Sequence, residues 1–410
     1  MLLWVKTRGS WPSGALASIM LQMGPVLAVD PPPNRILPQP DNQRGQLPMN
    51  RLAPLNGPSV PRILMALFLA IGLAACARGT EEAETADEAT PAPTFPELPG
   101  YAPIDIPANN PMTVEKVALG KQLYYDQRLS GDGLRSCYGC HVQEKGLTDG
   151  LPLAVGAFDR TLTRSAPTMW NVGYYPQLYW DGRSGALEAQ VKGAWGGGNM
   201  GASGNDGAPS MDDISAQLNE IPGYRQQFES VFGEPATPDH VAFAVAAFMR
   251  TIVSTDSRWA RFQSGDQSAF NDQEKRGWGI FGEKAKCTNC HDAILLTDMQ
   301  YHNIGIGMDA DNPDVGRGKV TSQERDTGAF KTPTVLDISK SAPYMHDGSV
   351  ATLEEAVDLM LAGGLPNQWL DEVNLEETKN ANLSAEEKAD LLAFLRALDV
   401  NYTIAAPTLP

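Results

Sequence analysis

Two short stretches hold most of the reactive side chains in this sequence. The first reads CYGCH at residues 137–141 and the second reads CTNCH at residues 287–291. Each places two thiols and an imidazole within five positions. Together they use four of the chain's 5 cysteines and two of its 5 histidines. Their shared chemistry should therefore define what the protein does.

Three chemistries use the Cys-x-x-Cys spacing: a redox dithiol, half of a zinc site, and covalent haem attachment. A thioredoxin-like dithiol needs a βαβ neighbourhood, and neither stretch has strand patterns around it. Zinc stays open as the alternative. The histidine that directly follows each pair favours haem, because the thiols can bond the vinyl groups while the imidazole binds iron. We expect two haem c groups, bound by Cys137, Cys140 and His141 and by Cys287, Cys290 and His291.

Covalent haem attachment takes place outside the cytoplasm, so an export signal is expected. A basic segment from Met49 leads into the apolar run ILMALFLAIGLAA, which is followed by Cys76. This run is shorter than the ~20 residues of a membrane span and is typical of a secretory signal. The LAAC ending predicts a lipoprotein-type signal with lipidation of Cys76, and simple cleavage nearby is the alternative. Residues 1–75 are thus predicted to be leader and signal segment.

The rest of the chain is acidic and long enough for two domains. The whole sequence carries a net charge of −17, which disfavours nucleic acid and favours a positively charged partner. Simple solubility explains the charge equally well. Residues 76–99 are acidic and contain several prolines, a composition that predicts a disordered tether. We expect an N-terminal peroxidatic c-haem domain over 100–265 and a C-terminal electron-transfer c-haem domain over 266–405.

The elements that position the two stretches are predicted to be helices. Apolar residues recur at helical spacing, and capping signals precede several segments. Alternating strand patterns are nearly absent. The fold class predicted is therefore all-α, with two cytochrome c-like haem domains and long loops. The expected helices are 113–126, 237–254, 271–285, 352–361 and 384–398.

From about Asn110 to about Val400, the sequence resembles the bacterial di-haem cytochrome c peroxidases, the family that includes MauG-type enzymes. Five stretches carry the resemblance: NPMTVEKVALGKQLYYDQRLSGDG before the first haem, SAPTMWN, YWDGR, GAFKTPTVLDISKSAPYMHDGS and LEEAVDLM. The resemblance implies peroxide reduction with electrons from a small soluble donor. It also implies roles for individual residues around each haem.

The sixth coordination position of the first haem is predicted to be open. Family members with a second histidine on this haem carry it in a Gly-His step of the loop after the first CxxCH stretch. Here that loop reads AVGAFD, with Ala157 at the matching place, and there is no histidine between His141 and His240. An open position lets peroxide bind iron. Methionine would close the site in the alternative reading, with Met169, Met200 and Met211 as the candidates.

For the second haem, the resemblance selects Met360 of LEEAVDLM as the sixth ligand, where MauG-type enzymes have tyrosine. A His/Met pair raises the reduction potential and suits a haem that accepts electrons. Taken alone, Met360 would be interpreted as core packing, because it shares a helical face with Leu353, Ala356 and Val357. Met299, Met308 and Met345 are local competitors.

Three residues match positions that the family uses near its first haem. Trp180 of YWDGR matches a tryptophan between the haems, although ordinary aromatic packing would also explain it. Gln190 matches a glutamine of the peroxide pocket. The family glutamate that follows is replaced by Asn199 in WGGGNMGA, and asparagine cannot transfer a proton. Glu188 and Asp206 are the nearest acidic residues that could replace it.

The resemblance also implies a calcium ion between the domains. Ser165 stands where the family has an asparagine ligand, while Ser341 and Pro343 retain the backbone carbonyls. Because calcium takes six to eight oxygen ligands and accepts water, we expect at most a weakened site. The other histidines are expected to play supporting roles: His346 in hydrogen bonding, His302 in packing or contact with a haem propionate, and His240 at the surface.

The expected function is reduction of hydrogen peroxide at the first haem, with electrons entering at the second from a c-type cytochrome or a copper protein. Two alternatives stay open: a MauG-like enzyme that oxidises a protein side chain, and a non-catalytic electron-transfer cytochrome. The predicted location is the periplasmic side of a bacterial membrane, held there only by the lipid on Cys76. No nucleic acid partner is expected, and a homodimer stays open.

Overall fold

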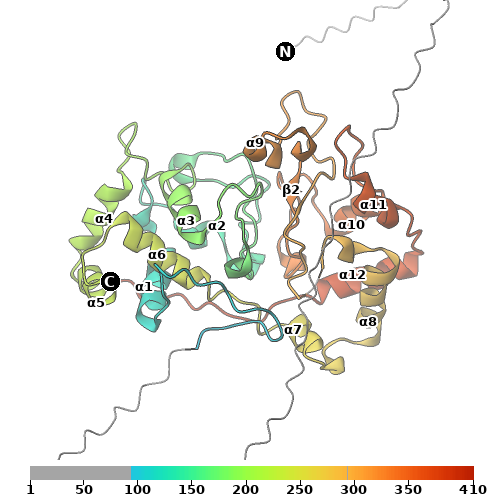
Figure 1. Ribbon diagram of the computed structural model, residues 1–410, viewed down its shortest axis with the longest axis horizontal. Coiled ribbons are helices and arrows are strands. Elements are labelled where there is room, and N and C mark those ends of the chain that lie inside the picture. Colours follow the sequence, from blue (N-terminus) through green and yellow to red (C-terminus); the bar gives the residue numbers. More distant parts are fainter. Residues whose placement is uncertain (1–93, 293) are drawn as a thin grey trace, which may run out of the picture. The chain divides into compact units, whose positions relative to one another are not determined.

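The computed structural model describes residues 94–292 and 294–410 (Figure 1). All the described residues belong to one compact unit. The predictions for residues 1–75, for Cys76 and for most of the tether lie outside the described residues. Within the described part, no helix is both long and apolar enough to cross a membrane.

The same helix pair occurs beside each CxxCH stretch. Helix α1 (Val114–Tyr125) precedes the first stretch and packs against α6 (Pro238–Met249). Helix α8 (Asp272–Gly279) precedes the second stretch and packs against α12 (Ala385–Arg396) (Figure 1). This repetition agrees with the predicted fold class of two cytochrome c-like helical regions, whereas the boundary at residue 265 stays a prediction.

Helix starts follow their capping residues closely. Helix α10 begins with a capping box: the Thr352 hydroxyl accepts from the Glu355 backbone N–H, and the Glu355 side chain accepts from the Thr352 backbone N–H. Ser384 and Glu387 form the same capping box at the start of α12. These reciprocal bonds satisfy N–H groups that a helix leaves unpaired. The predicted helix 237–254 ends earlier, at Met249, and 271–285 divides into α8 and a π-helical turn, Ile280–Lys284.

The remaining elements are short and separated by long loops. A two-stranded antiparallel sheet pairs β1 (Tyr301–His302) with β2 (Phe330–Lys331), with Tyr301 opposite Lys331. Mostly helical structure with little sheet confirms the predicted all-α class. The other α-helices are α2 (Cys137–Cys140), α3 (Leu187–Gly196), α4 (Met211–Asn219), α5 (Pro222–Phe232), α7 (Arg258–Gln263), α9 (Arg317–Thr321), α10 (Leu353–Leu361) and α11 (Glu372–Lys379).

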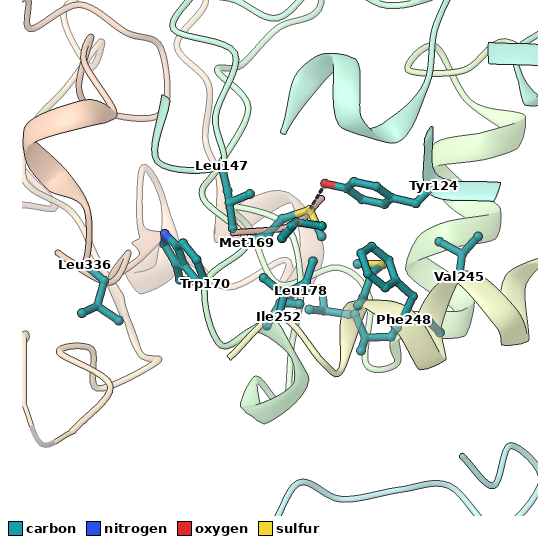
Figure 2. Close-up of a cluster of buried hydrophobic side chains, with 14 of the residues drawn as sticks. Tyr124, Leu147, Met169, Trp170, Leu178, Val245, Phe248, Ile252 and Leu336 are labelled. Carbon is teal, nitrogen blue, oxygen red and sulfur yellow. Dashed lines mark hydrogen bonds between the residues drawn. The ribbon is translucent and has the colours of Figure 1, made fainter. Parts of the chain in front are cut away.

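A buried apolar cluster lies beside the first CxxCH stretch (Figure 2). Tyr124 of α1 and Phe248 of α6 meet edge to face, with ring centroids 5.1 Å apart. The Tyr124 hydroxyl points at the Met169 sulfur, 3.6 Å away. Trp170 is fully buried, and its indole N–H donates to Asp337 across 167 positions of sequence at 2.8 Å. The core therefore joins segments from both halves of the described chain.

Glycine permits the close approach of each helix pair. A Cβ added at Gly120 would lie 1.8 Å from the Ala244 carbonyl oxygen, and one at Gly277 would lie 2.1 Å from that of Asp390. Both contacts are with backbone atoms, which cannot rotate away. A methyl group at either position would therefore push two packed helices apart.

We predict that Gly277→Ala lowers the free energy of unfolding by about 1–3 kcal/mol, the usual cost of overpacking a core. Gly279→Ala is the matched control, because a Cβ there meets nothing within 4 Å. The control should be neutral or slightly stabilising, since alanine favours helix by up to about 1 kcal/mol over glycine. Denaturant titration of both haem-loaded variants measures the difference. Equal stability of the two variants would contradict the proposed helix contact.

Candidate haem sites

The first CxxCH stretch opens onto a large cavity. Its volume is about 1250 Å³, above the ~300–1,000 Å³ typical of cofactor sites, so there is room for a haem. Cys137, Cys140 and His141 all line this cavity. Ser136 caps α2 by accepting from the Gly139 backbone N–H, and this single turn of helix places both thiols on the cavity wall.

The His141 ring is oriented for iron binding through one nitrogen. Its Nδ1 lies 3.1 Å from the Leu147 carbonyl oxygen, so Nδ1–H donates to that carbonyl and Nε2 is left as the acceptor. Burial lowers the pKa of His141, an effect that the Leu147 hydrogen bond opposes only in part. The imidazole is therefore neutral, the form that binds a metal.

The thiols do not fit a redox dithiol. Burial raises the pKa of Cys137 to about 12 and that of Cys140 to about 11. Reactive dithiols need the opposite shift, because the thiolate is the nucleophile. Among the described residues, the one group of three or more potential metal ligands is Cys290, Asp298 and His302. This group has a single cysteine, so neither CxxCH stretch forms the four-cysteine or Cys₂His₂ set of a structural zinc site. Haem attachment is thus the chemistry that the donor set fits.

The predicted peroxide-pocket residues line the same cavity as His141. Trp180, Gln190 and Asn199 are all on its wall, and among the described residues His141 is the only histidine there. Gln190 is presented by α3, a helix that the sequence patterns did not predict.

Two of the three competing methionines also line the first cavity, Met169 and Met200, whereas Met211 does not. Met169 is already engaged, since its sulfur accepts from the Tyr124 hydroxyl, which also lies 3.4 Å from the His141 carbonyl oxygen. Met169 therefore belongs to the surroundings of His141, and Met200 is the stronger competitor.

Ala157 lies in a tightly packed loop and does not line the first cavity. Its backbone N–H donates to the Asn199 carbonyl at 3.0 Å. A Cβ at Gly156 would lie 2.1 Å from the Gly198 carbonyl oxygen, and one at Gly201 would lie 2.8 Å from the Ala157 Cβ. The loop around Ala157 and the loop carrying Asn199 are therefore held together through backbone contacts that glycine makes possible.

Neither acidic residue considered as a replacement for the missing glutamate lines the first cavity. Glu188 accepts from Arg250 at 2.7 Å and from Asn110 at 2.7 Å, so it belongs to a structural ion pair. Asp206 is exposed on a loop. Among the described residues that line the first cavity, only Asp181 and Asp314 carry carboxylates, and both are paired with arginine.

The second CxxCH stretch opens onto a smaller cavity of about 230 Å³. Cys287, Cys290 and His291 line it together with Met360 from α10, and Nδ1 of His291 lies 3.1 Å from the Leu296 carbonyl oxygen. The orientation repeats that of His141. The volume is below that of typical cofactor sites, while the lining supplies the two thiols, the imidazole and the thioether of a haem c site. Of the competing methionines, Met345 also lines the cavity, while Met299 and Met308 do not.

Trp180 lines both cavities. Its indole N–H donates to the Ser165 carbonyl at 3.0 Å, and its own carbonyl accepts from the Lys331 backbone N–H at 2.8 Å. These two bonds fix the tryptophan in the wall between the sites. A Cβ at Gly182 would lie 1.8 Å from the Tyr301 hydroxyl, so YWDGR needs its glycine to approach β1.

Arg164 organises the charges at this wall. It forms ion pairs with Asp181 at 2.8 Å and with Asp314 at 2.6 Å, and its guanidinium lies 5.2 Å from the Phe330 ring centroid. Burial alone would raise the pKa of Asp181, yet the hydrogen bonds and charges of Arg164 and Arg183 outweigh burial and hold that pKa below its usual value. Asp181 is therefore ionised.

The three other histidines have separate surroundings. His346 stacks on Phe330 with centroids 3.6 Å apart, and burial lowers its pKa to about 4. His302 lines the second cavity, with its ring nitrogens 2.5 Å from Asp371 and 2.8 Å from Asp298. His240, in the first turn of α6, lies 4.4 Å from the Phe232 ring centroid and is partly exposed.

The residues expected to bind calcium lie near one another without forming an evident cation site. Ser165, Ser341 and Pro343 all line the second cavity. The Ser165 hydroxyl donates to the Met345 carbonyl at 2.9 Å, and the Ser341 hydroxyl donates to that of Ile338 at 3.3 Å. Among the described residues, no carboxylate cluster accompanies these three.

Comparison with known proteins agrees with this arrangement. Residues 114–268 match the family model described as di-haem cytochrome c peroxidase. Cytochrome-c peroxidase IdrP1 of Pseudomonas sp. is 34% identical over 355 residues, which cover 78% of this chain and 91% of that protein. Methylamine utilization protein MauG of Methylorubrum extorquens is 39% identical over 313 residues, covering 74% and 84%.

A solved structure shows the same fold. The crystal structure of a MauG-like protein associated with microbial copper homeostasis matches with a TM-score of 0.67 and 34% identity, covering 76% of this chain and 97% of that one. The chain therefore belongs to the di-haem cytochrome c peroxidase family, which includes MauG. It is an oxidoreductase, and the cofactor that family membership implies is haem c.

Proposed function

We propose that this protein is a di-haem c-type peroxidase that reduces hydrogen peroxide to water. Cys137 and Cys140 would hold one haem with His141 as iron ligand. Cys287 and Cys290 would hold the second, with His291 and Met360 as its ligands. Bound haem iron supplies the electron-transfer chemistry and, where a coordination position is open, a binding place for peroxide. Each peroxide takes up two electrons and two protons and yields two waters.

The observation that carries this proposal is the difference between the two cavities. The first is large and presents one histidine together with Gln190 and Asn199. The second is small and presents Met360 together with the histidines His291, His302 and His346, of which His291 directly follows the cysteine pair. Such a pair of sites suits one iron that binds substrate and one that only exchanges electrons. Trp180, on the wall of both cavities, is the natural route between them.

The electron donor is proposed to be a small soluble c-type cytochrome or copper protein with a positive contact surface, given the chain's net charge of −17. The protein is proposed to act on the periplasmic side of a bacterial membrane, anchored only by a lipid on Cys76. Sedimentation of the haem-loaded protein would decide whether it forms a homodimer.

A peroxide assay with a reduced donor tests the function. The oxidised haem-loaded protein is mixed with hydrogen peroxide and reduced cytochrome c while donor oxidation and haem absorbance are recorded. Turnover without prior reduction of the enzyme supports the proposal. Absence of donor oxidation at any peroxide concentration contradicts it and favours the non-catalytic electron-transfer alternative, for which Asn199 in place of glutamate is the main argument.

The MauG-like alternative is favoured by the 39% identity to MauG. It would oxidise a side chain of a protein substrate through the same first site. Met360 in place of the tyrosine typical of that group argues against it. Formation of an oxidised protein product without donor consumption would favour this alternative.

The missing glutamate makes a gain of function testable. Asn199 lines the first cavity, and among the described residues no unpaired carboxylate does so. We predict that Asn199→Glu raises kcat for peroxide reduction by about 10²-fold, the lower end of what a general acid-base group contributes in typical enzymes. Asn199→Gln is the control, since it lengthens the side chain without adding a titratable group. Equal rates in the two variants would contradict this role.

Calcium binding at Ser165, Ser341 and Pro343 stays a prediction, and removal of the ion tests it. If calcium is bound, dialysis against a chelator should lower the thermal midpoint by a few degrees, and calcium but not magnesium should restore it, because magnesium demands a tighter octahedral site. Metal analysis of the dialysed protein gives the stoichiometry. A filled site would give about one calcium ion per chain before dialysis. A value below about one tenth of an ion per chain would refute the prediction.

A further inference from the structure

Lys331 lies in the wall between the two cavities and lines both of them. It is the second residue of β2, and its backbone N–H donates to the Trp180 carbonyl at 2.8 Å. Pairing of β1 with β2 fixes its backbone opposite Tyr301. The lysine is therefore held beside the proposed route between the sites.

The ammonium group of Lys331 has polar but no anionic neighbours at contact distance. Its Nζ donates to the Gln177 carbonyl at 3.1 Å and lies 4.4 Å from the Tyr175 ring centroid. Among the described residues, no carboxylate forms an ion pair with it. Burial lowers the pKa of Lys331 to about 8, and the charge of Asp181 opposes that shift only in part.

Two arginines of the first cavity, close to Trp180 in sequence or in space, are neutralised by carboxylates. Arg164 pairs with Asp181 and Asp314, and Arg183 also pairs with Asp181 at 3.0 Å. Among the described residues that line both cavities, Lys331 is the one with a charged side chain, and it is half-buried and has no ion-pair partner. Withdrawing an unpaired ammonium partly from water costs free energy, so its presence calls for a functional reason.

A fixed positive charge has a defined effect on nearby redox groups. The interaction between two charges falls inversely with their distance and is stronger inside a protein than in water. A cation in the wall therefore favours an added electron in either cavity. It also disfavours removal of an electron from the Trp180 ring.

We propose that Lys331 is a positioning residue whose charge sets the redox balance between the two sites: it favours electron uptake by haem in both cavities and opposes oxidation of Trp180. This inference rests on the proposed function, because it assumes haem in each cavity. The inference concerns the reduction potentials of the haems, whereas the proposed function concerns peroxide reduction, so either can be refuted without the other. Lys331 is not assigned contact with substrate.

The test compares Lys331→Gln with Lys331→Arg in the haem-loaded full chain. Glutamine removes the charge while its amide can still donate to the Gln177 carbonyl, and arginine keeps the charge. Spectroelectrochemical titration should show lower reduction potentials for both haems in Lys331→Gln, by an amount equivalent to about a tenfold change in the equilibrium, which is about 59 mV for one electron. Lys331→Arg should restore most of the shift. Lys192→Gln, at an exposed pair with Asp239, should change neither potential.

Unchanged potentials in Lys331→Gln would overturn the inference. Failure of Lys331→Gln to take up two haems, measured by haem content per chain, would also overturn it, because the lysine would then be structural. A change of donor-dependent turnover without any change in potential counts against it as well. A different outcome is that the wild-type protein fails to reduce peroxide while Lys331→Gln still shows the lower reduction potentials. That outcome would refute the proposed function and would leave the inferred role of Lys331 intact.

Discussion

Replacement of His141 by alanine should lower peroxide reduction by more than about 10²-fold. Removing even an outer partner of a metal ligand commonly costs 10–100-fold, so loss of the proposed ligand itself should exceed that range. The thioether bonds to Cys137 and Cys140 do not depend on His141, and haem should stay attached. Steady-state turnover with a reduced donor and haem content per chain measure the two effects together.

The second haem provides the internal control for His141→Ala. Its proposed ligands, His291 and Met360, line a separate cavity and should keep their absorbance and potential. His240→Ala is the matched substitution, since that ring stacks on Phe232 far along the sequence from either CxxCH stretch. Peroxide turnover by His141→Ala within tenfold of wild type, a margin of about 1.4 kcal/mol, would show that reduction takes place elsewhere.

Met360→His should lower the reduction potential of the second haem strongly. Thioether ligation raises the potential relative to a second imidazole, and axial ligands span about 0.8 V among haem proteins. A shift of about a quarter of that range corresponds to more than about 10³-fold in the equilibrium for electron uptake, at 59 mV per tenfold. Donor-dependent turnover should fall with it. Spectroelectrochemical titration measures the potential directly.

Met345→Leu distinguishes between the two methionines of the second cavity. Leucine removes the sulfur at similar volume, and both methionines line the cavity. If Met360 is the ligand, Met345→Leu keeps the absorbance of sulfur-ligated haem and Met360→Leu loses it. The reverse pattern would transfer the ligand role to Met345.

Local signals predicted the helices best. The Thr352 and Ser384 capping boxes fix helix starts through neighbouring residues, so the sequence alone was sufficient for α10 and α12. Helix α3 starts at Leu187 without a side-chain cap and ends in a run of glycines, which explains why it was not predicted. Helix α5 could have been found, because Pro222 stands in its first turn and Gly233 follows its last residue.

The same distinction applies to the sites. Cysteine and histidine spacing defines a haem-binding stretch within five residues, so Cys137, Cys140 and His141 needed no tertiary information. The position of Trp180 in the wall depends on bonds to Ser165 and Lys331, which are distant in sequence. Lys331 was not predicted, since its partial burial and its lack of a carboxylate partner arise only when β2 meets residues 177–180.

The proposed peroxidase activity requires that the first iron keeps one coordination position free of protein ligands. Electron paramagnetic resonance of the fully oxidised, haem-loaded protein, recorded before any reductant is added, tests it most directly. We predict one high-spin ferric signal from the first haem and one low-spin signal from the second, with the high-spin signal alone converting to low spin on addition of cyanide. Two low-spin signals in the resting protein would show that a protein side chain occupies that position and would refute the open site.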